Sequence, residues 1–260
     1  MQRIMNERAP RPKPLRLIVG RNPVVEALST GVAIEKIFLL RTATGDDIIA
    51  IKKLAAQHNI PLTQVPAEKL DRFTKVQHQG VVALAGLLQY VDLQAGISHV
   101  VESGDTPLFI MLDGVTDVRN IGAIARTAWC CGAQGIVLPT SHAATLGEDA
   151  IKTSAGALNK IMLLRTPSVQ QAIDVFRLNG IQVMGTEMRG SIPIHEADFK
   201  IPTCFVMGAE DKGISKEVLK RADVLIRVPM AAKFDSLNVS VAAGMILYEA
   251  MRQRGNWLTR

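Results

Sequence analysis

Residues 204–215 read CFVMGAEDKGIS, and this stretch indicates the fold of the longer part of the chain. Its first four residues are apolar without alternation, and a glycine-bounded polar loop follows at once. Continuous apolar runs between helix-like stretches are typical of parallel strands that helices cover on both faces. Such sheets bind ligands outside the carboxyl ends of their strands. The same kind of run recurs as LFIML, GIVLP, IMLL, IQVMG and VLIRV. We therefore predict a mostly parallel α/β domain over residues 105–260.

A second, smaller α/β domain is predicted over residues 17–88. KIFLL, PLTQV and GVVALAG are typical of strands, and DDIIAIKKLAAQHN is typical of a helix with one apolar face. Residues 89–104 show no long periodic run and end in Ser-Gly-Asp, which indicates a linker. Residues 1–16 are rich in proline and basic residues and are predicted to be a flexible tail.

The positive charge of the chain is concentrated at its start. The formal net charge is +6, and the sequence pI is about 9.4. Over residues 1–21, six basic residues stand against one acidic residue, so the remaining chain is nearly neutral. A basic arm on a near-neutral body suits a polyanion such as nucleic acid, and a solvated tail is the alternative.

Cysteine and histidine usage favours neither disulfides nor metal chemistry. Cys130, Cys131 and Cys204 form no CxxC pair, and the five histidines include no HExxH. We expect buried thiols in a reducing compartment, and no metal site. No secretory signal and no apolar stretch of membrane-spanning length is apparent, which predicts a cytoplasmic protein.

Three loops that follow predicted strands carry the candidate functional residues. The first, LDGVTDVRNIGAIARTA at residues 112–128, places Asn120 where it can cap a helix that carries Arg126. Six residues are nearly two turns, so both side chains are expected on the same side of that helix. A plain cap with a surface arginine is the alternative interpretation.

The other two loops have a related design. In FVMGAEDKGIS, Glu210 lies at the mouth of a glycine-bounded loop that lacks the lysine of a P-loop. RVPMAAKFDSLNVSVAAG, residues 227–244, passes from a strand through an irregular loop to Ser236 and Asn238 at a helix start. Backbone N–H groups at a helix start are available to a ligand. A plain turn is the alternative for each loop alone, but their shared position at strand ends favours a binding site.

The three loops resemble the three motifs of the SpoU (TrmH-like) branch of the SPOUT RNA methyltransferases. GRNPVVEAL and HQGVVALA are similar to the two ends of that family's L30e-like substrate-binding domain, so the resemblance covers almost all of the chain from residue 17. The positions that match the three motifs are Asn120 and Arg126; Gly208, Glu210 and Gly213; and Pro229, Met230 and Ser236 to Ser240.

The resemblance implies a trefoil knot, S-adenosylmethionine as cofactor, a homodimer, and 2′-O-methylation of a ribose in RNA. The layout, with Ala209 in the second motif, is most similar to the bacterial members that methylate a guanosine in 23S rRNA. The implied catalytic residues are Asn120, Arg126, Glu210, Ser236 and Asn238. The implied cofactor-binding residues are Thr186, Gly208, Val228, Met230 and Leu237. The implied RNA-binding residues are Arg21, Asn22, His78 and Gln79.

Two alternatives remain on the same fold: a tRNA 2′-O-ribose methyltransferase, and a non-catalytic RNA-binding or ribosome-assembly protein. The presence of Asn120, Arg126, Glu210 and Asn238 argues against the non-catalytic protein. Arginine is a poor general base, so we expect Arg126 to stabilise negative charge. Gly244 and its small neighbours predict that the last helix packs closely at the knot or at a dimer interface.

Overall fold

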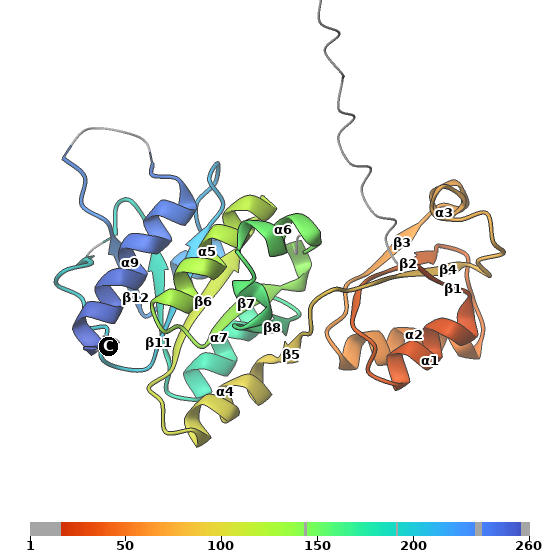
Figure 1. Cartoon of the computed structure of the whole chain (residues 1–260), viewed down its shortest axis with the longest axis horizontal. Coiled ribbons are helices and arrows are strands. Elements are labelled where there is room, and N and C mark those ends of the chain that lie inside the picture. The colour runs from red at the N-terminus through yellow and green to blue at the C-terminus, as the bar shows by residue number, and fades with distance from the viewer. Residues whose placement is uncertain (1–16, 143–144, 191, 232–235, 256–260) are drawn as a thin grey trace, which may run out of the picture.

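The computed structural model describes residues 17–142, 145–190, 192–231 and 236–255. The predicted tail, residues 1–16, lies outside the described residues. The described strands form two separate sheets, of four and eight strands. The sheets lie in two lobes that the segment between β4 and β5 connects (Figure 1).

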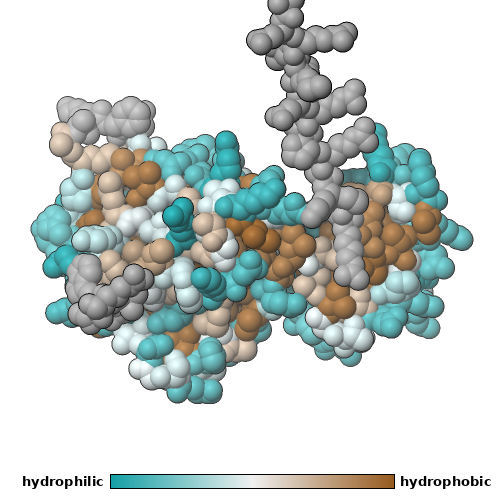
Figure 2. Space-filling view, in the orientation of Figure 1, coloured by the Kyte–Doolittle hydropathy of each residue, from teal (hydrophilic) through white to brown (hydrophobic). Residues whose placement is uncertain are grey.

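The four-stranded sheet has the order β1-β4-β2-β3, in which only the β2–β3 pair is parallel. Helices α1 and α2 pack against one face through apolar residues such as Val24 and Ile51, and α3 packs against the other through Leu70. In Figure 2, apolar residues gather over the sheet of this right-hand lobe. Its elements are β1 (Leu17–Val19), α1 (Arg21–Ser29), β2 (Ile34–Leu40), α2 (Asp46–Gln57), β3 (Leu62–Val65), α3 (Ala67–Phe73) and β4 (Val81–Ala85).

The eight-stranded sheet has the order β10-β12-β9-β11-β6-β7-β8-β5, and all of its neighbours are parallel. Its strands are β5 (Val91–Asp92), β6 (Leu108–Asp113), β7 (Gly135–Pro139), β8 (Met162–Thr166), β9 (Gln182–Thr186), β10 (Ile192–Pro193), β11 (Thr203–Gly208) and β12 (Val224–Arg227). Its α-helices are α4 (Leu93–Glu102), α5 (Val118–Cys130), α6 (Glu148–Thr153), α7 (Val169–Leu178), α8 (Lys216–Arg221) and α9 (Val239–Arg254).

Helices cover both faces of the larger sheet, as the unalternating strands predict. Successive residues of β6 point to opposite faces: Ile110 joins a core with α5 and α9, whereas Phe109 joins a core with α4 and α7. Every apolar run quoted from the sequence is a strand in the structure. The prediction of a mostly parallel α/β fold is therefore confirmed, and the trefoil knot stays a prediction.

The segment expected to be a linker contains a helix that sequence analysis missed. Within residues 89–104, β5 joins the edge of the larger sheet and α4 follows it, with the Asp92 carboxylate accepting hydrogen bonds at the helix start. Leu93, Ile97 and Val100 are buried in the core of the larger sheet. Their spacing is helical, but the run is only two to three turns long and includes a glycine, so the periodic signal is short.

Gly244 does not allow a close approach within one chain. A Cβ added there would meet only the Cγ2 atom of Thr127, at 3.7 Å, which is an ordinary contact. The close packing predicted for this glycine is therefore not found between α9 and α5. An interface with a second chain stays a prediction.

Candidate functional site

The three loops meet at one edge of the eight-stranded sheet. Gly208, the last residue of β11, lies beside Asp113, the last residue of β6. On the other side of β11, β9 ends at Thr186, which lies beside Ile226 of β12. The strands are parallel, so all four carboxyl ends open onto the same region. The prediction that the motif loops gather at strand ends is confirmed.

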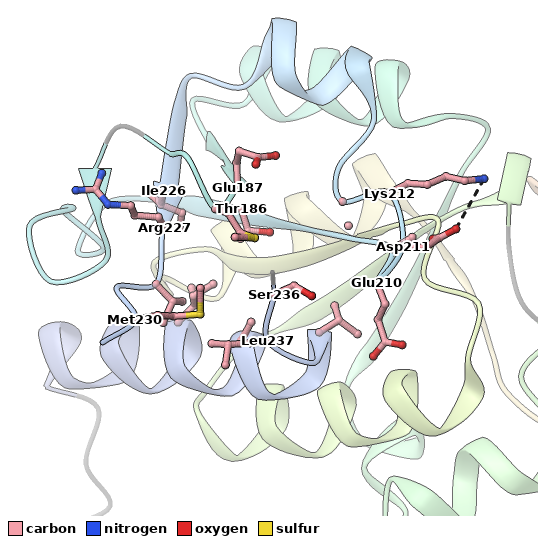
Figure 3. A pocket seen from close by; sticks show the side chains of 18 residues that line it. Thr186, Glu187, Glu210, Asp211, Lys212, Ile226, Arg227, Met230, Ser236 and Leu237 are labelled. Carbon is pink, nitrogen blue, oxygen red and sulfur yellow. Dashed lines mark ion pairs between the residues drawn. The ribbon is translucent and has the colours of Figure 1, made fainter. Parts of the chain in front are cut away.

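A pocket of about 350 Å³ lies at this edge (Figure 3). The five residues predicted to bind the cofactor line it: Thr186, Gly208, Val228, Met230 and Leu237. Ile226, Val239, Ala242 and Ile246 add apolar walls, while Glu187, Glu210 and Ser236 add polar groups. An apolar cavity with a few convergent polar groups is the usual form of a small-molecule site.

Gly208 is required by close backbone contact. A Cβ at this position would lie 2.0 Å from the carbonyl carbon of Gly213, so no side chain fits. The loop folds back on itself because the Ala209 and Gly213 backbones exchange two hydrogen bonds, of 3.1 and 2.8 Å. Gly213 has a φ of +65°, which glycine adopts without strain. The two glycines of the second motif therefore shape the rim of the pocket.

Three side chains from the three loops are bonded to each other beside this pocket. The Glu210 carboxylate accepts hydrogen bonds from the side-chain amides of Asn120, at 3.1 Å, and Asn238, at 2.5 Å. The Asn238 amide also donates to the Asn120 side-chain oxygen, at 3.1 Å. Figure 3 shows Glu210 directed from its loop towards the helices that carry these partners. Asn120 precedes Glu210 by 90 positions and Asn238 by 118 positions in the sequence, yet the three side chains form one polar cluster.

Asn238 fixes this cluster to the start of α9. Its side-chain oxygen accepts hydrogen bonds from the backbone N–H groups of Ser240 and Val241, so it is the N-cap of the helix. The prediction that Asn120 caps its own helix is wrong. Asp117 caps α5, and Asn120 lies in the first turn, where its amide is available to Glu210. The Arg119 guanidinium beside Asp117 holds the pKa of that carboxyl below its usual value.

Arg126 does not join the polar cluster. It lies on α5, exposed, and no hydrogen bond or ion pair connects it to Asn120, Glu210 or Asn238 among the described residues. The expectation that it shares a side with Asn120 is wrong. At 3.6 residues per turn, six residues rotate a side chain to about 120° from the first. Arg126 therefore faces solvent in a single chain.

The structure adds pocket residues that the motif pattern did not single out. Glu187 follows Thr186 at the end of β9, so the strand-end rule alone could have found it. Gly190 is not a lining residue, but it follows Glu187 closely in the chain, and a Cβ there would be 2.6 Å from the backbone of Ile226, a contact that the sequence does not predict. Asp211 and Lys212 also line the pocket, but Figure 3 shows their side chains pointing away from its centre.

In the smaller lobe, three of the four residues predicted to bind RNA line one surface depression. Arg21, Asn22 and Gln79 line it together with Asp47. The Arg21 Nε–H donates to the Gln79 carbonyl oxygen at 3.1 Å, and the Arg21 backbone N–H donates to the Gln79 side chain at 3.1 Å. His78 is adjacent in sequence, but its ring contacts Asp71 and the Gly80 backbone.

The expectation of buried thiols holds for two of the three cysteines. Cys131 and Cys204 are buried, and burial raises the pKa of both thiols. Cys130 is exposed, because it lies at the last position of α5 on the side away from the sheet. Within the part of the chain that the structure describes, no helix could span a membrane and no group of side chains could hold a metal ion.

Two sequence families match the chain, one for each sheet. The family described as "RNA 2'-O ribose methyltransferase substrate binding" matches residues 17–91. The "SpoU rRNA Methylase family" matches residues 107–248, more than half of the chain and all three motif loops. The chain belongs to the SpoU rRNA methylase family. The polar cluster described above is therefore formed by motif residues of a family of RNA methyltransferases.

Relatives of this SpoU family member support the assignment over its whole length. YacO of Bacillus subtilis strain 168, assigned to the TrmH family of tRNA/rRNA methyltransferases, is 34% identical over 91% of this chain and 95% of its own. The AdoMet-bound rRNA methyltransferase of Sinorhizobium meliloti is 26% identical, with a TM-score of 0.57 over 92% of this chain and 87% of its own.

A third relative shows the fold alone. The SpoU methyltransferase AviRb of Streptomyces viridochromogenes, solved in complex with AdoMet, has a TM-score of 0.60 at 24% identity and covers 94% of this chain and 92% of its own. Both solved relatives therefore match this SpoU protein across its two sheets, not across the larger one only.

Proposed function

We propose that this protein transfers a methyl group from S-adenosylmethionine to the 2′-oxygen of a ribose, in a guanosine of 23S rRNA. The observation that carries the proposal is the bonded cluster of Asn120, Glu210 and Asn238 at the edge of a preformed pocket. Membership of the SpoU family supports the reaction class. The two-lobed layout and Ala209 are the features that favour rRNA, through the resemblance to the 23S rRNA enzymes.

The pocket residues fit S-adenosylmethionine, which when bound supplies a methyl group on a positively charged sulfonium. Gly208 and Gly213 bring backbone to the rim where side chains would intrude. The apolar walls formed by Ile226, Val228 and Leu237 suit an adenine ring. Glu187 and Glu210 supply negative charge for a cationic ligand. We propose that these residues bind and orient the cofactor and take no part in the chemical step.

The polar cluster is proposed to position the ribose. Glu210 accepts from both asparagines and so fixes the direction of each amide, while Ser236 lies at the same pocket wall. Groups held in place before the substrate arrives lower the entropic cost of reaching the reactive arrangement. Arg126 is proposed to stabilise the developing alkoxide and a neighbouring phosphate, because its pKa above about 12 makes it a poor base.

The smaller lobe, residues 17–88, is proposed to bind RNA, and residues 105–260 are proposed as the catalytic domain. Of the predicted linker, residues 89–104, β5 and α4 belong to the larger lobe. Arg21, Asn22, His78 and Gln79 are the proposed contacts, and the residues 1–16 add charge for a polyanion. An RNA substrate of this kind is also the reason to propose the cytoplasm as the site of action.

A homodimer is proposed through α5 and α9. Val241, Met245 and Tyr248 are exposed at spacings of four and three residues, which places them on one side of α9. Trp129 on the adjacent α5 is also exposed. Exposed apolar side chains gathered on neighbouring helices are typical of protein interfaces. Met245→Asp should therefore give monomers in sedimentation equilibrium, and a dimer of unchanged stability would contradict this interface.

Methyl transfer from radiolabelled S-adenosylmethionine tests the proposed function. Label should enter 23S rRNA, and nuclease mapping should place it on one 2′-oxygen. Label in tRNA alone would instead favour a tRNA 2′-O-methyltransferase. The assignment of the Bacillus relative to tRNA/rRNA methyltransferases is compatible with either substrate. No transfer to either RNA, with RNA binding intact, would favour a non-catalytic assembly protein.

A further inference from the structure

A buried polar cluster joins the two lobes at a distance from the pocket. It consists of Glu35 on β2, Tyr90 in the connecting segment, the backbone N–H of Leu146, and Arg165 on β8. Glu35 is 4% exposed and Arg165 is 3% exposed. In Figure 1, β5 and β8 lie on the side of the larger lobe that faces the smaller one. We call this set the Glu35–Arg165 cluster.

Each polar group in the Glu35–Arg165 cluster has a partner from another segment. The Arg165 guanidinium donates to the Ile34 carbonyl oxygen at 2.8 Å, to the Glu35 carbonyl oxygen at 3.2 Å and to the Glu35 carboxylate at 3.1 Å. That carboxylate also accepts from the Tyr90 hydroxyl at 2.7 Å and from the Leu146 N–H at 3.0 Å. The guanidinium carbon lies 3.3 Å from the centre of the Tyr90 ring.

This arrangement sets orientation more than it adds stability. A buried ion pair gains little free energy net of desolvation, because both groups are well hydrated when the lobes separate. With one partner displaced, however, the other is left buried and unpaired, at a high cost. The planar guanidinium of Arg165 donates hydrogen bonds along its edge and stacks on the Tyr90 ring with its face, so Glu35 can bind it from few directions. Only a narrow range of lobe orientations satisfies every group.

The cluster is also connected to the helix that carries Asn120. Leu146 lies just before α6, and α6 packs against α5 so closely that a Cβ at Gly122 would be 2.8 Å from the Cβ of Thr153. Gly122 is two residues from Asn120. The smaller lobe is thus held against a unit that includes one of the three residues of the polar cluster at the pocket.

We propose that the Glu35–Arg165 cluster is a positioning device, which holds the RNA-binding lobe at one fixed orientation so that a bound ribose is presented to the pocket. This proposal rests on the proposed function for its second half only. Glu35, Tyr90 and Arg165 are positioning residues and contact neither cofactor nor ribose. Methylation then depends on a contact that lies outside both the pocket and the RNA-binding surface.

The first experiment measures orientation and needs no activity. Dyes are attached at Lys53→Cys on α2 and Glu102→Cys on α4, both exposed, in a Cys130→Ser background. Single-molecule energy transfer is recorded with an excess of unlabelled protein, so that each assembly carries one dye pair. The parent should give one narrow distance distribution, and Arg165→Met should give a broad one.

Two further variants and a control keep this test interpretable. Glu35→Gln and Tyr90→Phe change the cluster with little change in shape and should also broaden the distribution, even if Arg165→Met fails to fold. Arg177→Met breaks a pair with Asp223, of 3.0 Å, near the end of α7, where neither residue contacts the Glu35–Arg165 cluster, and should leave the distribution narrow. Folded Glu35 and Arg165 variants with the parent's narrow distribution would overturn the proposal.

The second experiment measures single-turnover methyl transfer at saturating RNA and cofactor. Misplaced reactants commonly cost about 10- to 100-fold in rate, and Arg165→Met should show a loss in this range with cofactor affinity unchanged. A broadened distribution with a rate within about twofold of the parent, far short of that loss, would overturn the positioning role. A parent protein that methylates no RNA would refute the proposed function, while the distance measurement would still decide whether the cluster fixes the lobes.

Discussion

The two lobes hold their candidate polar residues in different ways. At the larger sheet, Asn120, Glu210 and Asn238 come from three loops, and their side chains are bonded to each other beside a pocket with apolar walls. At the smaller sheet, Arg21 is bonded to the Gln79 backbone and side chain around an open surface depression. The difference teaches that the first region is organised for a small group before it binds, whereas the second is a surface that suits a large partner.

Arg126 is the sharpest test of this contrast, because the family pattern assigns it to the first region although a single chain leaves it exposed. Arg126→Ala should lower the single-turnover rate by about 10²- to 10³-fold, the usual cost of one preorganised electrostatic contact, without changing cofactor affinity. Arg126→Lys should recover little, since lysine lacks the planar fork of donors.

The matched control is Lys152→Ala, which removes an exposed cation from α6 and should be silent. Rates would be measured at saturating RNA and cofactor, with calorimetry for cofactor binding. A rate for Arg126→Ala within about threefold of the parent would remove this residue from the mechanism, because an electrostatic contact is worth far more.

The close backbone contact at Gly208 predicts the next largest effect. In Gly208→Ala, the added Cβ would lie 2.0 Å from the Gly213 carbonyl carbon, so the loop must move. Overpacking of this kind costs about 1–3 kcal/mol, which corresponds to roughly 5- to 150-fold in cofactor affinity if the displaced loop is the binding wall. Gly147→Ala is the control, since a Cβ there meets nothing within 4 Å. Equal affinities for the two variants would show that the loop does not contact the cofactor.

Asn238 links a structural role to a site role, and the two can be separated. Asn238→Ala removes the N-cap of α9 and should lower the free energy of unfolding by about 1 kcal/mol. It should also slow methyl transfer, because Glu210 and Asn120 lose their common partner. Ser168→Ala removes the cap of α7 and should cost similar stability without slowing the reaction. Stopped-flow kinetics measure the rate of methyl transfer, and thermal unfolding measures the stability. Similar transfer rates in the two variants would show that Asn238 acts only as a helix cap.

The smallest effect is expected in the open region. Arg21→Ala should weaken RNA binding only a few-fold. It should also reduce the slope of log affinity against log salt concentration by about 1, the change expected for one lost phosphate contact. Cofactor affinity should not change, because Arg21 lies in the other lobe. Filter binding over a series of salt concentrations measures both quantities. Lys52→Ala, an exposed cation on α2, is the control, and an equal loss in the two variants would point to diffuse attraction instead of a contact at Arg21.

Sequence patterns predicted the fold well wherever burial is simple. The unalternating runs became parallel strands because both of their faces are covered, and their ends brought the motif loops together. The side chains that meet there could be named because the three loops resemble the three motifs of a known family. The two-residue strands β5 and β10 gave no pattern to detect, and α4 gave only a short one.

Other features depend on distances that a linear pattern does not contain. Glu35 and Arg165 are 130 positions apart, and each reads as an ordinary charged residue in an apolar run. The contact that forbids a side chain at Gly190 comes from the backbone of β12. Arg126 lies on a different side of α5 from the predicted one for a simpler reason, because six residues are only about 1.7 turns of a helix.

The strand order of the larger sheet also determines when the pocket comes into existence. β11 lies between β9 and β6, and β12 lies between β9 and the edge strand β10, so the last two strands to be synthesised fill the two gaps that join β9 to the rest of the sheet and to β10. Among the described residues, those that line the pocket all lie between positions 186 and 246. Contacts between distant segments form slowly, and domains made first on the ribosome tend to fold first. The smaller lobe should therefore be complete and able to engage RNA while the nascent chain still has no place for a cofactor.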